Sequence, residues 1–197
     1  MIKLLLIATL AAFAVTHVTQ GQGRLFPSVD NVSGAPPLSA FEEEWYSKHL
    51  RAMGESQLTQ AQGETYRFLW LRTFANPVVV RISCAEKRCD LTAVRLGGSG
   101  GYEPGSVVER KARGLSEQET TNLRELIGRA QLWQAQPPDS RIGLDGAQWV
   151  LEVSHEKRYH LWNVWSPESS GQHATFRELC LEMIRLSGLT IRSSEVY

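Results

Sequence analysis

The sequence predicts an α+β domain, in which helices pack on one face of an antiparallel sheet of about five strands. Two observations lead to this prediction. Short apolar runs typical of strands follow one another with only turn residues between them. Segments with helical periodicity stand before, between and after these runs. The expected order of elements is α-β-β-β-α-β-β-α, within a single domain at residues 39–197.

Three helices are predicted from their start signals and apolar stripes. Ser39 with Glu42, and Ser116 with Glu119, have the three-residue spacing of a capping box, which marks the first turn of a helix. The third helix contains the sequence "FRELCLEMIRLSGL", in which apolar residues recur at helical spacing. Each helix therefore has one face suited to packing against a sheet.

Five strands are predicted from runs of β-branched, aromatic and aliphatic residues. They cover residues 66–74, 77–83, 90–96, 147–154 and 159–165. The sequence "GGSGGYEPG" follows the third strand and is predicted to form a mobile surface loop. Its glycines do not have the spacing of a phosphate-binding loop. We expect Gly100, Gly101 and Tyr102, near its centre, to contact a binding partner.

The first residues have the pattern of an export signal. Lys3 precedes an apolar run at residues 4–15, which is too short to cross a bilayer. We predict a signal peptide at residues 1–21 and a flexible linker at residues 22–38, and an uncleaved N-terminal anchor is the alternative. The mature protein is then periplasmic or secreted, with no transmembrane span after signal cleavage.

The overall composition is that of a globular protein. Hydrophobic residues make up 42% of the chain and charged residues 21%, and the formal net charge is zero. A nucleic-acid-binding protein presents a basic face, which this balance does not indicate. We therefore expect no nucleic-acid partner.

The chain contains three cysteines, and cysteines that lie close together form disulfides in an oxidising compartment. Cys84 and Cys89 flank a four-residue connection between two predicted strands, so that they lie opposite each other and are expected to form a disulfide. Their spacing is not that of a redox motif. Cys180 lies on the apolar stripe of the last predicted helix, which indicates a buried structural thiol rather than a nucleophile.

The hairpin at residues 147–165 contains the strongest catalytic candidates, Glu152, His155 and His160. A two- or four-residue loop pairs Ser154 with Tyr159 and places Glu152 and His160 on opposite faces of the sheet. A three-residue loop puts Glu152 and His160 on one face, where they could act together as acid and base. The absence of glycine from this turn favours the even loop.

A metal site built on His155 and His160 needs at least one more ligand. Asp145 and His173 are the candidates, although Asp145 precedes a glycine in a typical turn sequence. Structural roles are the preferred interpretation of all these side chains, and no cofactor is predicted.

The sequences "GLDGAQWVLE", "YHLWNVWSP" and "FRELCLEMIRLSGL" resemble a family of secreted bacterial proteins of unknown function. The sequences "EEEWYSKHLRAMGE" and "YRFLWLRTFANPVVVRI" are similar to it as well. The resemblance implies a bacterial, exported, single-domain protein, and it implies no activity or cofactor.

No sequence motif of a serine hydrolase, zinc protease or β-lactamase is present. We therefore expect a non-enzymatic protein of the cell envelope that binds another protein, for example an inhibitor or immunity protein. The alternative is a small envelope hydrolase or metal-dependent enzyme that uses Glu152 with His155 or His160.

Overall fold

The computed structural model describes residues 25–27, 38–58, 63–134, 143–156 and 158–197. The expected signal peptide and most of the expected linker lie outside these residues. The elements follow one another as α1 (Ala40–Met53), β1 (Glu64–Arg72), β2 (Val78–Ala85), β3 (Arg88–Leu96), β4 (Val107–Gly114), α2 (Glu117–Ala130), β5 (Ala147–His155), β6 (Arg158–Trp165), α3 (Ala174–Ser187) and a short 3₁₀ helix, η2 (Ser193–Glu195).

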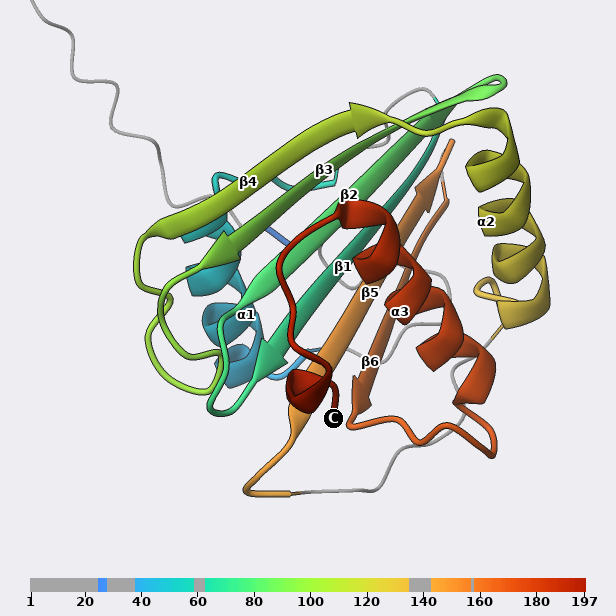
Figure 1. Ribbon diagram of the computed structural model, residues 1–197. Helices are drawn as coiled ribbons and strands as arrows, with labels where there is room; N and C mark the ends of the chain where they lie inside the picture. Colours follow the sequence, from blue (N-terminus) through green and yellow to red (C-terminus); the bar gives the residue numbers. More distant parts are fainter. Residues whose placement is uncertain (1–24, 28–37, 59–62, 135–142, 157) are drawn as a thin grey trace, which may run out of the picture.

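The sheet is antiparallel throughout and has the strand order β4-β3-β2-β1-β5-β6 (Figure 1). The predicted fold class is confirmed, but the sheet has six strands instead of five. The additional strand, β4, stands between β3 and α2 in the chain and forms one edge of the sheet. Its sequence, "VVERKARG", lacks the apolar alternation of a buried strand, because nearly all of it is exposed.

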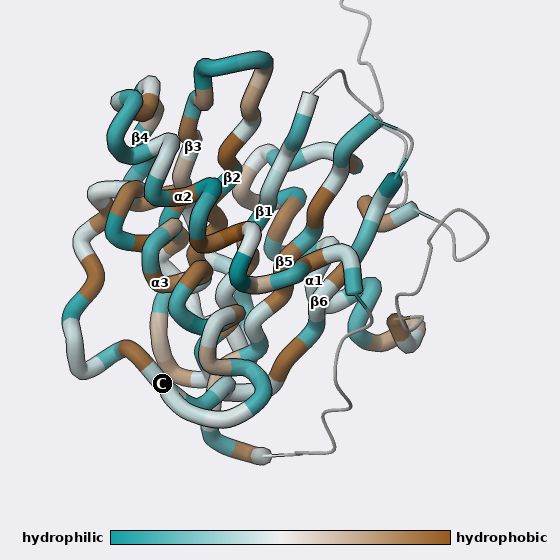
Figure 2. Tube along the Cα trace, turned by 90° about the vertical axis from the view of Figure 1, so that its right-hand side faces the viewer, coloured by the Kyte–Doolittle hydropathy of each residue, from teal (hydrophilic) through white to brown (hydrophobic). Residues whose placement is uncertain are grey.

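The helices cover both faces of the sheet, which corrects the prediction that they share one face. Helices α2 and α3 lie on one side, and α1 lies on the other (Figures 1 and 2). Two apolar cores result, one on each face. The central strands β1 and β5 are buried on both faces, and such strands need a covering layer on each side.

The helix starts follow the sequence signals. Ser39 with Glu42 and Ser116 with Glu119 form complete capping boxes, as predicted. Helix α1 is followed by Gly54, whose φ of 79° lies in the left-handed region where glycine is favoured. Because these contacts are local, the positions of the helices could be predicted from the sequence. The face of the sheet that each helix covers could not be predicted in this way.

The edge strand β4 forms hydrogen bonds with a helix on each face of the sheet. Arg110 points to one side and donates to the carbonyl of Met53, at the end of α1, at 3.1 Å. Arg113 points to the other side and donates from Nη2 to the carbonyl of Leu186, in the last turn of α3, at 2.9 Å. A cation at a helix C-terminus satisfies free carbonyls and complements the helix dipole. Because side chains alternate between the two faces of the sheet, this one strand contacts the helices on both sides.

Part of the expected linker belongs to the core. Leu25 and Phe26 are buried on the α1 side of the sheet, where the ring of Phe26 meets Tyr46 edge-on at 6.2 Å between centroids. The Pro- and Gly-rich composition of residues 22–38 indicated a flexible segment, but two apolar residues within it suffice to anchor it locally.

Candidate functional site

The hairpin of β5 and β6 has the register that was favoured from the sequence. Ser154 lies opposite Tyr159, and His155 lies opposite Arg158. As a consequence, Glu152 faces α1, whereas His155 and His160 face the side of α2 and α3. The proposed acid–base pairs of Glu152 with these histidines are therefore not assembled.

Glu152 belongs to a buried ion-pair network on the α1 side. It accepts from Nε of Arg67 at 2.6 Å and from the hydroxyl of Tyr159 at 2.8 Å. Arg67 also pairs with Glu55 at 3.4 Å. Burial lowers the pKa of Arg67, but the attraction of Glu152 and Glu55 more than offsets this, so that the net change in its pKa is upward. The opposite charges of this buried network neutralise one another, so we assign the network a structural role.

The other candidate metal ligands do not form one group, although His160 and His173 both lie edge-on to Trp162, at 6.4 and 6.5 Å between ring centroids. His155 is at one end of β5, 3.6 Å from Glu64, and His160 is buried beside Trp162. Asp145 precedes the opposite end of β5, so the length of a strand separates it from His155. Within the described residues, no group of three or more His, Cys, Asp or Glu side chains is placed to hold a metal ion.

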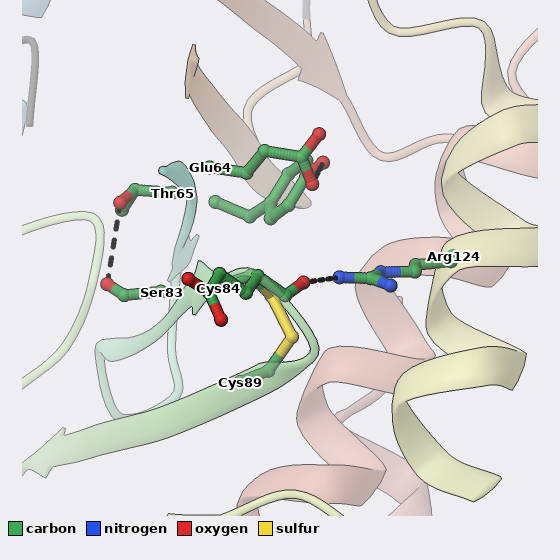
Figure 3. The surroundings of a disulfide bond; sticks show 8 residues. Glu64, Thr65, Ser83, Cys84, Cys89 and Arg124 are labelled. Atoms are coloured by element: carbon green, nitrogen blue, oxygen red, sulfur yellow. Dashed lines mark hydrogen bonds between the residues drawn. A yellow bond between two sulfur atoms is a disulfide. The ribbon is translucent and has the colours of Figure 1, made fainter. Parts of the chain in front are cut away.

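The cysteines are arranged as predicted. Cys84 and Cys89 are directly opposed in the β2–β3 hairpin and form a disulfide (Figure 3). Arg124 of α2 donates to the carbonyl of Glu86 in the adjoining turn, which joins the hairpin tip to the helix layer. Cys180 is free and fully buried, and burial raises the pKa of its thiol well above the ordinary value, which keeps it unreactive.

The glycine-rich loop between β3 and β4 forms hydrogen bonds with two other parts of the domain. Gly100 accepts from the indole of Trp45 at 2.8 Å and donates to the carbonyl of Ala75 at 3.0 Å. A β-carbon on Gly100 would come within 2.5 Å of the backbone of Arg72, so only glycine fits there. Gly101 and Tyr102 are exposed, whereas Gly100 is buried.

An open cleft lies at the end of the sheet where this loop, the β1–β2 turn and the start of β5 meet. We call it the end cleft, and its volume is about 810 Å³. It is lined by residues 74–76, 97–99 and 145–146 together with Arg192, Ser194, Glu195 and Tyr197. The lining combines exposed apolar surface with hydroxyl, amide, carboxylate and guanidinium groups.

Two exposed aromatic rings stand at the rim of the end cleft. Phe74 lines the cleft and is 65% exposed, and Tyr102 is 59% exposed. Their ring centroids are 6.4 Å apart. Exposed neighbouring aromatic side chains mark interaction surfaces, because water is released from both rings when a partner covers them. The structure thus adds Phe74 to Tyr102, which was predicted from the loop sequence alone.

A buried cation lies beneath the same cleft. Arg72 has no exposed surface, and its guanidinium stacks on Trp70 at 4.1 Å. Its Nη1 donates to Oε2 of Glu195 at 3.1 Å, and its Nη2 donates to the carbonyl of Asn76. Arg72 was not among the site residues predicted from the sequence. The available signal was its inward position in β1, two residues after Trp70, where an apolar residue is expected.

None of the helices in the described parts of the chain has the length and apolar character needed to cross a bilayer. No protein-family model and no curated protein matches the sequence. The interpretation of the end cleft therefore rests on its own lining, which is about half apolar.

Proposed function

We propose that the protein is an exported, non-enzymatic binding protein of the cell envelope that holds a partner polypeptide at the end cleft. The aromatic pair of Phe74 and Tyr102 at the cleft rim is the observation that carries this proposal. Aromatic side chains supply large contact areas at a small cost in conformational entropy, and they dominate the energetics of protein interfaces.

The rigidity of the surroundings supports a binding role. Trp45 from α1 and Asn76 from the β1–β2 turn fix the glycine-rich loop by hydrogen bonds to its carbonyls, at 2.8 and 2.9 Å. A surface that is already ordered loses little entropy when a partner binds. An inhibitor or immunity protein directed against an envelope-attacking enzyme is one form that such a module takes.

Export is part of the proposal and rests on two features. Lys3 and the apolar run at residues 4–15 have the pattern of a signal peptide. The disulfide between Cys84 and Cys89 is compatible with an oxidising compartment such as the periplasm.

The experiment compares capture of envelope proteins by the tagged wild-type chain and by the double variant Phe74→Ser/Tyr102→Ser. Phe41→Ser is the matched control, because Phe41 is 74% exposed but lies on α1, outside the end cleft. We expect a stoichiometric partner that is retained by the control and lost by the double variant. Near-ultraviolet circular dichroism checks that all variants are folded.

The affinity for the purified partner is then measured for Tyr102→Glu, which adds charge to the rim. We expect weaker binding with unchanged folding. Unchanged affinity would remove the loop from the interface, and equal capture by the double variant and wild type would overturn the proposal.

A further inference from the structure

The protein contains two fully buried arginines on β1, Arg67 and Arg72, and their electrostatic environments differ. Arg67 faces two carboxylates, Glu152 and Glu55, and its pKa is raised. Arg72 pairs with Glu195, and burial lowers its pKa although Glu195 attracts the charge. The charge of Arg67 is thus compensated, and that of Arg72 is compensated incompletely.

The hydrogen bonding of Arg72 is also incomplete. Its two terminal nitrogens reach Glu195 and the carbonyl of Asn76, but its Nε has no hydrogen-bond partner among the described residues. A buried guanidinium nitrogen without a partner is costly, so it requires a physical explanation. Because both Asn76 and Glu195 line the end cleft, Arg72 lies directly beneath its floor.

The carboxylate that reaches Arg72 belongs to the segment of residues 191–197, in which Ile191 and Val196 are partly buried against the apolar core on the α2–α3 side. No residue of this segment is fully buried. Its polar attachments to the rest of the domain include the bonds of Glu195 to Arg72 and a bond from the indole of Trp149 to the carbonyl of Tyr197 at 3.3 Å. Segments with little buried surface open at a low free-energy cost. Opening of this segment would uncover Arg72 and the aromatic rings around it.

We infer that Arg72 is the carboxylate-binding subsite of the end cleft, that Glu195 fills this subsite in the free protein, and that an acidic side chain of a partner polypeptide replaces Glu195 on binding. The inference rests on the proposed function, because it assigns part of the partner's chemistry at the same cleft. The planar guanidinium, stacked on Trp70, is preoriented for a carboxylate.

Charge complementarity identifies the ligand of this subsite as a carboxylate. Arg192 donates from Nε to Oε1 of Glu195 at 2.7 Å, so two cations hold one carboxylate at this place. Arg72 stays on β1 when Glu195 leaves, so an incoming carboxylate meets its guanidinium, whereas Arg192 belongs to the segment that moves with Glu195. Glu195 competes with it as an intramolecular ligand, and this competition lowers the apparent affinity for the external group.

The test uses the full mature chain and two blocked peptides, acetyl-Ala-Glu-Ala-amide and acetyl-Ala-Gln-Ala-amide. Binding is followed by nuclear magnetic resonance through the indole N–H signals of Trp70 and Trp149, which flank the subsite. Glu195→Gln removes the internal competitor. We expect it to bind the Glu peptide about tenfold more tightly than the wild type does, with no such gain for the Gln peptide.

Two double variants separate the two cations. The gain should persist in Glu195→Gln/Arg192→Gln, because the side chain of Arg192 is exposed and lies on the segment that leaves the subsite. It should disappear in Glu195→Gln/Arg72→Lys, because an ammonium group cannot reproduce the stacked, planar donor. Equal binding of the two peptides, no gain in Glu195→Gln, or a gain that survives the Arg72 variant in a folded protein would each overturn the inference.

These outcomes are distinct from failure of the proposed function. The peptide titration needs no natural partner, and the capture experiment with Phe74→Ser/Tyr102→Ser leaves Arg72 and Glu195 unchanged. A captured partner with no carboxylate discrimination would reject the subsite alone. Carboxylate binding without a partner that depends on the aromatic pair would reject the proposed function alone.

Discussion

Arg67 donates its Nε–H to Oε2 of Glu152 at 2.6 Å across the β1–β5 pair, and neither side chain is exposed. The two residues are direct cross-strand neighbours, and both lie under the α1 layer. Glu152 therefore neutralises a buried cation, which is a different role from the acid–base function considered from the sequence.

Replacing Glu152 by Gln should destabilise the protein by about 3 kcal/mol, because breaking a buried ion pair leaves a charge without full compensation. Glu55 remains beside Arg67 and limits the loss. The free energy of unfolding, measured by urea denaturation, tests this. Glu44→Gln is the control, because its ion pair with Arg51 is on the surface and is worth about 0–1 kcal/mol. A loss for Glu152→Gln no larger than the control's would contradict the assignment.

Reduction of the disulfide should lower the free energy of unfolding by about 2 kcal/mol, since the bond closes only a short loop. The double variant Cys84→Ser/Cys89→Ser should show the same loss without reductant. Alkylation of the unfolded, non-reduced protein should modify one of the three cysteines, Cys180. Modification of all three cysteines would show that the disulfide is not formed.

The first turn of α2 should contribute a pH-dependent part of the stability. Hydrogen bonds from Arg113 lower the pKa of Glu119 from 4.5 to about 2. A carboxylate with a lowered pKa stabilises the folded state above its unfolded pKa, and this contribution is lost as the pH falls from about 4.5 to about 2.

The variant Glu119→Gln should therefore be less stable than the wild type at pH 7 by about 1 kcal/mol, and the difference should vanish near pH 2. Unfolding curves at several pH values measure the difference. Glu117→Gln, in the same helical turn, should show a smaller difference. A gap between Glu119→Gln and the wild type that is constant from pH 7 to pH 2 would be inconsistent with the pKa of Glu119.

Two glycines should respond in opposite directions to substitution by alanine. In Gly100→Ala the new β-carbon would overlap the backbone of Arg72, and we expect a loss of about 2 kcal/mol. In Gly128→Ala the β-carbon meets no atom within 4 Å on the exposed side of α2, and we expect a gain of about 0.5–1 kcal/mol. Thermal unfolding measures both. Stability of Gly100→Ala equal to the wild type would show that the loop is not packed against β1 as described.

The sequence predicted the features that depend on neighbouring residues. The capping boxes at Ser39 and Ser116 are local hydrogen bonds, so three-residue spacing is enough to locate them. The pairing of Ser154 with Tyr159 follows from an even number of loop residues. The disulfide between Cys84 and Cys89 is likewise fixed by a short hairpin.

Other features depend on contacts between distant parts of the chain, and only the tertiary structure decided them. Strand β4 has almost no apolar side, and its place is fixed by pairing with β3 and by Arg110 and Arg113 at the ends of two helices. The sequence alone likewise gives no means of pairing Arg72 with Glu195, because 123 positions separate them. By itself the sequence determined the three helices and five of the six strands, since these arise from short-range hydrogen bonds and periodicity. The end cleft was decided by the folded sheet, which brings residues from four separate segments to one end.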